Sequence, residues 1–211
     1  MNRKKIKVCG MKDPGNVTEL VQLNPDYIGF ILYEKSPRYI TLKTAENLVK
    51  NIPDSVQRVG VLVNMPIEEA LTIARTGVFD ILQLHGDESP DYCRQLSENV
   101  NIIKAFGVSD RLPEFIETYQ PFCKMFLFDA AGSVFGGTGK KFDHSILAGY
   151  NLDKQYLLSG GISENNASEL RNYPDRMAGV DLNSRFEVCS GIKNIIKLKE
   201  FIEKIRSNDN D

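Results

Sequence analysis

Met125-Phe126-Leu127-Phe128-Asp129 is an apolar run that ends in a carboxylate, and the loop-forming stretch Ala130-Ala131-Gly132 follows it directly. A second run of this kind, Ile6-Lys7-Val8-Cys9, ends in a thiol just before Gly10. Short runs that are almost continuously apolar are typical of parallel strands covered on both faces. The two runs therefore predict strands of one buried parallel sheet, each with a reactive side chain where the strand gives way to a loop.

An apolar run followed by a helix-like stretch recurs eight times along the 211 residues, roughly 25 residues apart, which is the spacing of a compact βα repeat. The expected strands are Ile6–Cys9, Tyr27–Leu32, Arg58–Val63, Ile81–His85, Ile102–Phe106, Met125–Asp129, Tyr156–Ser159 and Ala178–Leu182. We therefore predict a single (β/α)8 TIM barrel over residues 1–206, with Ser207–Asp211 as a polar tail. An open doubly wound sheet is the alternative, but Gly10-Met11-Lys12 is not the Gly-x-Gly-x-x-Gly turn expected after its first strand.

Residues typical of helix N-termini predict where several of the helices between the strands begin. The stretch Pro66–Thr76 opens with a proline at a first-turn position, and Ser89-Pro90 combines an N-cap residue with such a proline. Ser163-Glu164-Asn165 predicts another helix start, and Asn194–Ile205 carries apolar residues along one face. Together with the strands, these signals give the alternating order of a barrel.

Composition narrows the class of protein. The chain is 42% hydrophobic and 26% charged, which is ordinary for a globular domain, and its net charge of -2 lacks the basic excess of a nucleic-acid-binding protein. It contains no apolar run of about 18 residues and no basic leader, so we expect no membrane partner and a cytoplasmic location. The lysine-rich stretches Arg3-Lys4-Lys5 and Lys193 to Lys204 are expected to flank a strand and to form a solvated helix face.

Neither the cysteines nor the histidines indicate a metal site or a disulfide framework. The four cysteines, Cys9, Cys93, Cys123 and Cys189, form no C-x-x-C pair, which favours reduced thiols. The two histidines, His85 and His144, are too few for a histidine-built metal centre. We therefore expect no metal site.

Three segments that follow predicted strands are expected to meet at one rim of the barrel. Gly136-Gly137-Thr138-Gly139 follows the sixth strand, Ser159-Gly160-Gly161 closes the seventh, and Asn183-Ser184-Arg185 follows the eighth. Glycines let backbone N–H groups approach an anion, and barrel phosphate sites usually lie at the loops after strands 7 and 8. One glycine cluster alone could be a simple turn, but three such loop segments at one rim indicate a phosphate site.

Three further polar residues are expected at the same mouth. Arg38, in Ser36-Pro37-Arg38-Tyr39, suits a planar carboxylate, although a surface salt bridge is the alternative. His85 ends the fourth strand and could contact a ligand or satisfy nearby backbone groups. Asp181, inside the eighth strand, could bind sugar hydroxyls or be a buried structural acid.

Cys9 and Asp129 suggest the kind of chemistry. If both emerge at one mouth, the thiol could remove one proton and the carboxyl could deliver another, which is isomerase chemistry. The alternatives are a small buried hydrophobe for Cys9 and a loop cap for Asp129. Because a thiol ionises reluctantly near neutral pH, Cys9 needs a cationic or dipolar neighbour to act as a base.

These motifs, taken in order, resemble those of the phosphoribosylanthranilate isomerases of tryptophan biosynthesis. The matching stretches are Lys7-Val8-Cys9-Gly10, Gly29-Phe30, Ser36-Pro37-Arg38-Tyr39-Ile40, Val59-Gly60-Val61-Leu62-Val63-Asn64, Leu82-Gln83-Leu84-His85-Gly86, Asp129, Gly136-Gly137-Thr138-Gly139, Phe142-Asp143, Leu158-Ser159-Gly160-Gly161 and Asp181. The resemblance runs from the first strand to the last helix. It implies a TIM barrel and an Amadori rearrangement of N-(5-phosphoribosyl)anthranilate to 1-(2-carboxyphenylamino)-1-deoxyribulose 5-phosphate, with no metal or redox cofactor.

The resemblance also implies roles for individual residues. Asp129 falls in the position of the general acid that opens the ribose ring, and Cys9 in that of the base that takes the C2′ proton. Arg38 would hold the anthranilate carboxylate. The remaining substrate-binding positions are His85, Asp181, Gly137, Gly139, Ser159, Gly160, Gly161 and Ser184. The expected partner is this small phosphorylated substrate, bound by a monomer or a homodimer.

Two departures from the family pattern stand out. Asn183-Ser184-Arg185 replaces the usual Ser-Ser-Gly, and Arg185 could alter the phosphate loop or add positive charge there. His144 replaces the usual Trp after Phe142-Asp143, which we interpret as a packing substitution.

The rival functions are a histidine-pathway sugar-phosphate isomerase with two aspartates, a metal-dependent pentose-phosphate epimerase, and a catalytically silent phosphate-binding barrel.

Overall fold

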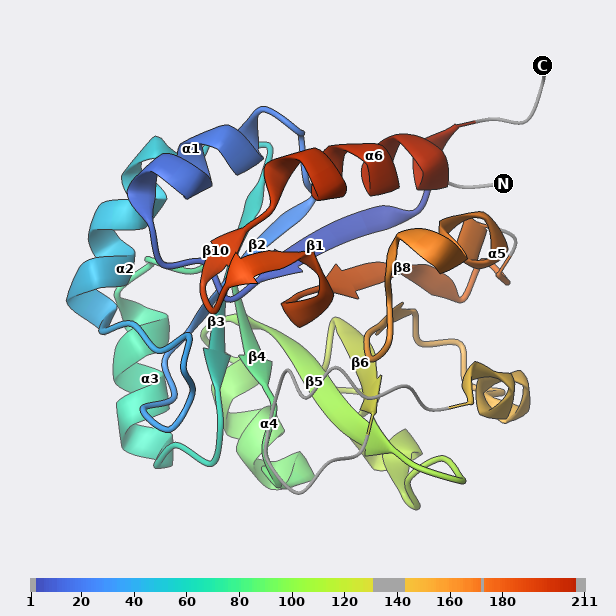
Figure 1. Cartoon of the computed structure of the whole chain (residues 1–211). Helices are drawn as coiled ribbons and strands as arrows, with labels where there is room; N and C mark the ends of the chain where they lie inside the picture. Colours follow the sequence, from blue (N-terminus) through green and yellow to red (C-terminus); the bar gives the residue numbers. More distant parts are fainter. Residues whose placement is uncertain (1–2, 131–142, 172, 208–211) are drawn as a thin grey trace.

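Eight parallel strands form one closed barrel, in the order of the sequence (Figure 1). The computed structural model describes residues 3–130, 143–171 and 173–207. The barrel strands are β1 (Lys5–Cys9), β2 (Tyr27–Ile31), β3 (Gln57–Leu62), β4 (Ile81–Leu84), β5 (Asn101–Val108), β6 (Met125–Ala130), β7 (Tyr156–Leu158) and β8 (Met177–Leu182). β1 pairs with both β2 and β8, which closes the ring. The predicted TIM barrel is therefore confirmed, and the open sheet is wrong.

The α-helices are α1 (Pro14–Val21), α2 (Leu42–Leu48), α3 (Ile67–Arg75), α4 (Pro90–Ser97), α5 (Ala167–Arg171) and α6 (Ile195–Arg206). Short 3-10 helices are η1 (Val49–Asn51), η2 (Ile116–Tyr119), η3 (His144–Gly149), η4 (Glu164–Asn166) and η5 (Ser184–Phe186). Figure 1 shows α6 beside α1 on the outside of the barrel. None of the helices within the described residues is long and apolar enough to cross a bilayer.

Side-chain caps explain where several helices begin. Ser89 accepts a hydrogen bond from the Tyr92 N–H at the start of α4, and Asn194 caps α6 in the same way. Ser163 and Asn166 form a reciprocal capping box, but the turn that follows is 3-10 rather than α. The α-helix predicted at this point begins only at Ala167.

A short hairpin between β8 and α6 was not predicted. It consists of β9 (Glu187–Cys189) and β10 (Ile192–Lys193). The hairpin turns Lys193 inward, and only 2% of its surface remains exposed, so its predicted place on a solvated helix face is wrong. The reason is local pairing, because its ammonium contacts Glu187 at 2.7 Å and the Asn183 side chain at 2.8 Å.

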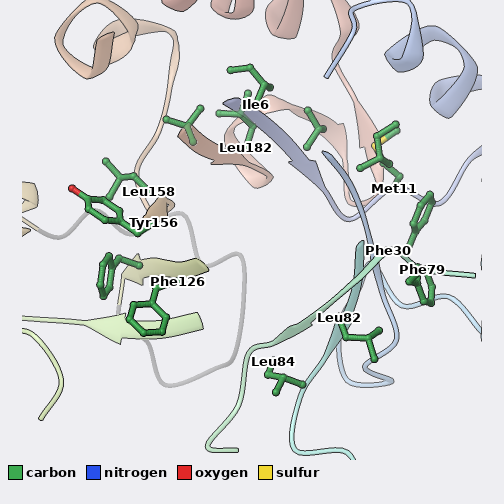
Figure 2. Packing of buried hydrophobic residues seen from close by; sticks show 14 of the residues in the cluster. Ile6, Met11, Phe30, Phe79, Leu82, Leu84, Phe126, Tyr156, Leu158 and Leu182 are labelled. Carbon is green, nitrogen blue, oxygen red and sulfur yellow. The ribbon is translucent and has the colours of Figure 1, made fainter. Parts of the chain in front are cut away.

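The apolar core has an outer and an inner layer. Figure 2 shows part of the outer layer, where side chains such as Phe30, Phe126 and Leu158 pack outside the strands. The inner layer fills the barrel with residues that include Val59, Ile81, Ile103, Leu127 and Leu157. Side chains alternate along a strand, so on β1 Ile6 and Val8 join the outer layer while Lys7 and Cys9 face the interior. A lysine and a thiol thus lie inside an otherwise apolar barrel.

Candidate active site

A pocket that opens to solvent lies at the carboxyl ends of the strands. Nine residues singled out from the sequence line it: Cys9, Arg38, His85, Asp129, Ser159, Gly160, Gly161, Asp181 and Ser184. The other two, Gly137 and Gly139, lie outside the described residues. The fold therefore brings together residues that are spread over most of the chain, at the place where TIM barrels carry their active sites.

Cys9 ends β1 and is 3% exposed. It lies directly against Gly29 of β2, where a Cβ atom would come within 2.7 Å of the Cys9 Sγ atom. Gly29 thus leaves the space that the thiol occupies. Burial raises the pKa of the Cys9 thiol, and the nearby Lys7 ammonium opposes this effect. The cationic neighbour expected for a cysteine base is present.

Lys7 and Asp181 form an ion pair inside the barrel. They are register partners on β1 and β8, and the Lys7 ammonium donates to the Asp181 Oδ1 atom at 2.9 Å. Burial lowers the pKa of Lys7, but the negative charge of Asp181 and the Cys9 thiol outweigh it and leave the pKa raised. Burial also raises the pKa of Asp181, against the opposing effect of Lys7. Asp181 is therefore a buried acid that also lines the pocket. Its binding of sugar hydroxyls stays a prediction.

Asp129 lies near the end of β6, facing the loops after β4 and β7. Its Oδ1 atom accepts a hydrogen bond from the Ala130 N–H at 2.9 Å, and its Oδ2 atom lies 3.5 Å from the His85 Nε2 atom. Gly160 packs so closely that a Cβ there would lie 3.0 Å from Oδ1. One oxygen is thus held by the backbone, and the other is directed toward His85.

His85 is oriented by a second side chain of β4. The His85 Nδ1 atom lies 2.9 Å from the Gln83 Nε2 atom, and Gln83 is buried in the barrel. If the Gln83 amide donates to Nδ1, the imidazole carries its proton on Nε2, the atom nearest Asp129. Gln83 thereby helps to set which ring nitrogen faces the carboxylate.

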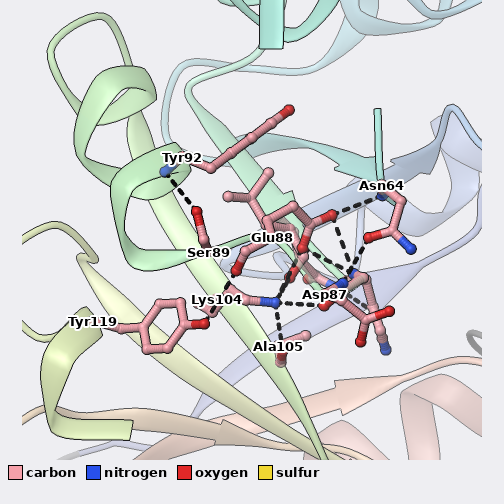
Figure 3. Close-up of polar contacts among 12 residues, drawn as sticks. Asn64, Asp87, Glu88, Ser89, Tyr92, Lys104, Ala105 and Tyr119 are labelled. Carbon is pink, nitrogen blue, oxygen red and sulfur yellow. Dashed lines mark hydrogen bonds and ion pairs between the residues drawn. The ribbon is translucent and has the colours of Figure 1, made fainter. Parts of the chain in front are cut away.

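The loop that follows His85 is clamped by a buried ion pair (Figure 3). The Glu88 carboxylate accepts hydrogen bonds from the backbone N–H groups of Asn64 and Gly86 and from the Lys104 ammonium, the last at 3.0 Å. Lys104 also donates to the Gly86 carbonyl at 2.7 Å. This cluster ties together the loops after β3 and β4 and so fixes the backbone beside His85.

Removing Lys104 should therefore destabilise the protein strongly. We expect Lys104→Met to lower the free energy of unfolding by about 3–5 kcal/mol, because it leaves the Glu88 carboxylate buried without its cation. Lys43→Met is the matched control, since Lys43 forms an exposed pair with Glu46 and should change the stability by at most about 1 kcal/mol. Urea denaturation measures both, and equal effects of the two substitutions would contradict the clamp.

Arg38 extends from the loop after β2 to the mouth of the barrel, but its guanidinium group already binds a carboxylate. Its Nε and Nη2 atoms donate to the two oxygens of Glu187 at 2.8 and 2.7 Å. Glu187 also accepts from the Lys193 ammonium and from the Gly191 N–H. Burial alone would raise the pKa of Glu187, but its bonds to Arg38 and Lys193 leave it lowered. Arg38 is thus neither free nor in a surface salt bridge, because its pair with Glu187 is buried.

The loop after β7 is built from two glycines in the left-handed region, Gly160 at φ 76° and Gly161 at φ 74°. The carbonyl of Gly160 lies 3.1 Å from the His144 Nε2 atom. Because a carbonyl accepts, the imidazole must donate from Nε2, so His144 holds this loop as well as filling space. Ser184 and Arg185, in η5, line the pocket beside this loop.

Sequence reasoning missed four residues of this site. Lys7 was detectable, because it precedes Cys9 by two positions on a strand and must share its face. Gln83 bears the same relation to His85. Glu187 and Lys193 lie in the unpredicted hairpin, and no periodic pattern marks such short strands.

Comparison with known proteins identifies the family. A sequence profile described as N-(5′-phosphoribosyl)anthranilate isomerase matches residues 6–204. The chain belongs to this family. The phosphoribosylanthranilate isomerase of Parabacteroides distasonis is 44% identical over 205 residues, which cover 95% of this chain and 92% of the relative. The crystal structure of phosphoribosyl anthranilate isomerase from Thermotoga maritima matches with a TM-score of 0.86 and 33% identity over 96% of this chain and 98% of that one.

A further solved phosphoribosyl anthranilate isomerase is described as a complex with reduced 1-(o-carboxyphenylamino)-1-deoxyribulose 5-phosphate. It matches with a TM-score of 0.82 and 30% identity, over 96% of this chain and 98% of that one. The resemblance seen in the motifs is confirmed by these matches. The roles assigned to single residues stay predictions.

Proposed function

We propose that the pocket at the barrel mouth converts N-(5-phosphoribosyl)anthranilate to 1-(2-carboxyphenylamino)-1-deoxyribulose 5-phosphate, a step of tryptophan biosynthesis. Family membership supports the reaction. The observation that carries the proposal for this chain is the meeting of a thiol, a carboxyl, a guanidinium and two left-handed glycines in one pocket. Cys9 and Asp129 supply a base and an acid, which an aldose–ketose rearrangement requires.

Asp129 acts first, as the general acid. It gives a proton to the furanose ring oxygen, the bond between that oxygen and C1′ breaks, and the anthranilate nitrogen forms a Schiff base with C1′. The Oδ2 atom is the proposed donor, because Oδ1 is engaged by the Ala130 N–H. His85, 3.5 Å from Oδ2, is placed to orient the carboxyl group.

Cys9 acts second, as the general base. The Sγ atom takes the C2′ proton, and the electron pair of the C2′–H bond becomes a double bond between C1′ and C2′. The electrons of the protonated imine move to nitrogen, so thiolate and iminium become thiol and neutral enolamine. The enol then tautomerises to the ketose: C1′ gains a proton from solvent, and the C2′ hydroxyl releases its proton to solvent as the C2′ carbonyl forms.

Binding falls to the surrounding groups. Glu187 accepts hydrogen bonds from the Nε and Nη2 atoms of Arg38. The Nη1 atom makes no hydrogen bond within the described residues, so it is the proposed contact for the anthranilate carboxylate. The phosphate is assigned to the loop Ser159-Gly160-Gly161 and to Ser184, together with Gly137 and Gly139. His85 and Asp181 face the sugar. The chain is proposed to act in the cytoplasm as a monomer or homodimer, without a nucleic-acid or membrane partner.

The direct test adds N-(5-phosphoribosyl)anthranilate to the purified protein and follows the loss of anthranilate fluorescence. Rapid loss with formation of the ketose product supports the proposal. If fluorescence persists while an aldose phosphate of histidine synthesis is isomerised, the chain is a related isomerase with another substrate. If the substrate binds without reacting, the chain is a silent phosphate-binding barrel.

Arg38 should affect substrate affinity more than turnover. A lost bond to a charged group is worth roughly 1.5–3 kcal/mol, so Arg38→Ala should raise KM about 10- to 150-fold while kcat falls less. Arg58→Ala is the matched control, because Arg58 also holds a carboxylate with Nε and Nη2, that of Asp80, at the opposite end of the strands. Steady-state kinetics with an unchanged KM for Arg38→Ala would remove Arg38 from the binding site.

A further inference from the structure

Lys7 is a charged residue that neither proposed step uses. Its side chain is fully buried, and its ammonium donates a hydrogen bond to Asp181 inside the barrel and also interacts with the Cys9 thiol. An ammonium withdrawn from water costs several kcal/mol even when it is paired, whereas an apolar residue would fill the same space in the inner layer without that cost. The Cys9 thiol lies on the same face of β1, two residues closer to the mouth.

We propose that Lys7 is a positioning residue that enables Cys9 to serve as the base, by stabilising its thiolate, and that Asp181 holds the Lys7 ammonium in place. The inference rests on the proposed role of Cys9. It assigns Lys7 a task in the same reaction that does not involve contact with the substrate.

Geometry supports this assignment. Residues two apart on a strand point to the same side, so the ammonium of Lys7 and the thiol of Cys9 share the barrel interior. Asp181 is the register partner of Lys7 on the neighbouring strand β8, and the 2.9 Å contact between them limits where the ammonium can move. The surrounding apolar side chains lower the local dielectric, which strengthens the attraction between the ammonium and a thiolate.

The other charged groups around Cys9 do not replace Lys7. Lys193, on β10, favours the thiolate, and Arg38, from the loop after β2, also interacts with Cys9. Both of these cations are bound to Glu187, as Lys7 is bound to Asp181, so pairing with a carboxylate alone does not set Lys7 apart. Asp181 disfavours the thiolate, but the Lys7 charge acts on the thiol more strongly than any of these groups.

The direction in which Lys7 shifts the pKa of the Cys9 thiol follows from burial and from the charges around it. Burial raises the pKa of the Cys9 thiol, and Lys7 is the main group that lowers it. Without Lys7 the pKa must rise, so a smaller fraction of Cys9 is thiolate at any given pH. The midpoint of Cys9 ionisation, and the acidic limb of kcat/KM that depends on it, should both move to higher pH.

The test measures the ionisation of Cys9 without relying on catalysis. The rate of Cys9 alkylation by iodoacetamide is followed against pH by mass spectrometry of the peptide that contains Cys9, in the full chain. We expect Lys7→Met to move the midpoint upward by about one pH unit or more, the size typical of losing a nearby opposite charge. Lys7→Arg keeps the charge and should stay closer to the wild type in both the alkylation midpoint and the acidic limb of kcat/KM.

A second variant guards against an effect of misfolding. Lys7→Met combined with Asp181→Asn removes both charges, leaves no unpaired ion, and should still shift the midpoint upward, because Lys7 acts on the thiol more strongly than Asp181. An unchanged midpoint in the folded double variant, or equal shifts in Lys7→Arg and Lys7→Met, would overturn the role of Lys7. Full turnover by Cys9→Ser would instead overturn the proposed base, whatever the alkylation shows.

Discussion

Asp129→Asn should lower kcat by about 10²–10⁴-fold, the usual contribution of a general acid, because an amide cannot release a proton to the ring oxygen. The substitution keeps the shape of the side chain, and its carbonyl oxygen can still accept the hydrogen bond from Ala130. Binding of the reduced product analogue should therefore change by no more than a few-fold. Steady-state kinetics and a binding titration measure the two quantities.

Asp80→Asn provides the control for this experiment. Asp80 is also a carboxylate beside a barrel strand, but it pairs with Arg58 away from the mouth. The hydrogen bonds from Arg58 hold the pKa of Asp80 in the folded protein below its ordinary value. The pair therefore stabilises the fold fully at pH values above the pKa that Asp80 has in the unfolded chain. This stabilisation is lost as the pH falls through the lower pKa that Asp80 has in the folded protein. Asp80→Asn should thus reduce stability near neutral pH and leave kcat unchanged. If Asp129→Asn behaves like Asp80→Asn, Asp129 is a structural cap.

Cys9→Ser should cause a loss of similar size. A serine hydroxyl is hardly ionised near neutral pH, so we expect kcat to fall by about 10²–10⁴-fold while the substrate still binds. The variant tests chemistry rather than packing, because serine fits the space beside Gly29. Cys189→Ser, at an exposed cysteine, is the control and should keep full activity. Near-normal turnover by Cys9→Ser would show that another group takes the C2′ proton.

The polar ends of the strands were the most predictable part of the site. Cys9 and Asp129 stood out because each closes a continuous apolar run, and closure of a parallel barrel brings all such ends to one rim. The prediction needed only the local pattern and the number of repeats. It did not require knowledge of how any two side chains meet.

The network around Arg38 could not be predicted in this way. Arg38 and Glu187 are 149 positions apart, and Glu187 and Lys193 lie in a hairpin whose strands are three and two residues long. Neither charge interrupts an apolar run, so nothing in the sequence marks them as buried. The sequence predicts Lys193 on a solvated helix face because it lies next to the lysine-rich helix, and only the inward turn of the hairpin reveals its contacts.

His144 shows an intermediate case. Its position after Asp143 marked it as a replacement within a family motif, which predicted a packing role. The structure adds the contact between its Nε2 atom and the Gly160 carbonyl. That contact depends on how η3 and the loop after β7 approach each other, which is a tertiary feature without a local signature.

The most direct test of Cys9 as the base is a single-turnover measurement of C2′ proton removal in the wild type and in Cys9→Ser, with substrate carrying hydrogen or deuterium at C2′. Single-turnover conditions exclude product release from the observed rate. Deuterium should slow the wild-type reaction, and Cys9→Ser should react about 10²–10⁴-fold more slowly than the wild type with hydrogen at C2′. A Cys9→Ser rate close to that of the wild type, with the same isotope dependence, would contradict the assignment of Cys9 as the base.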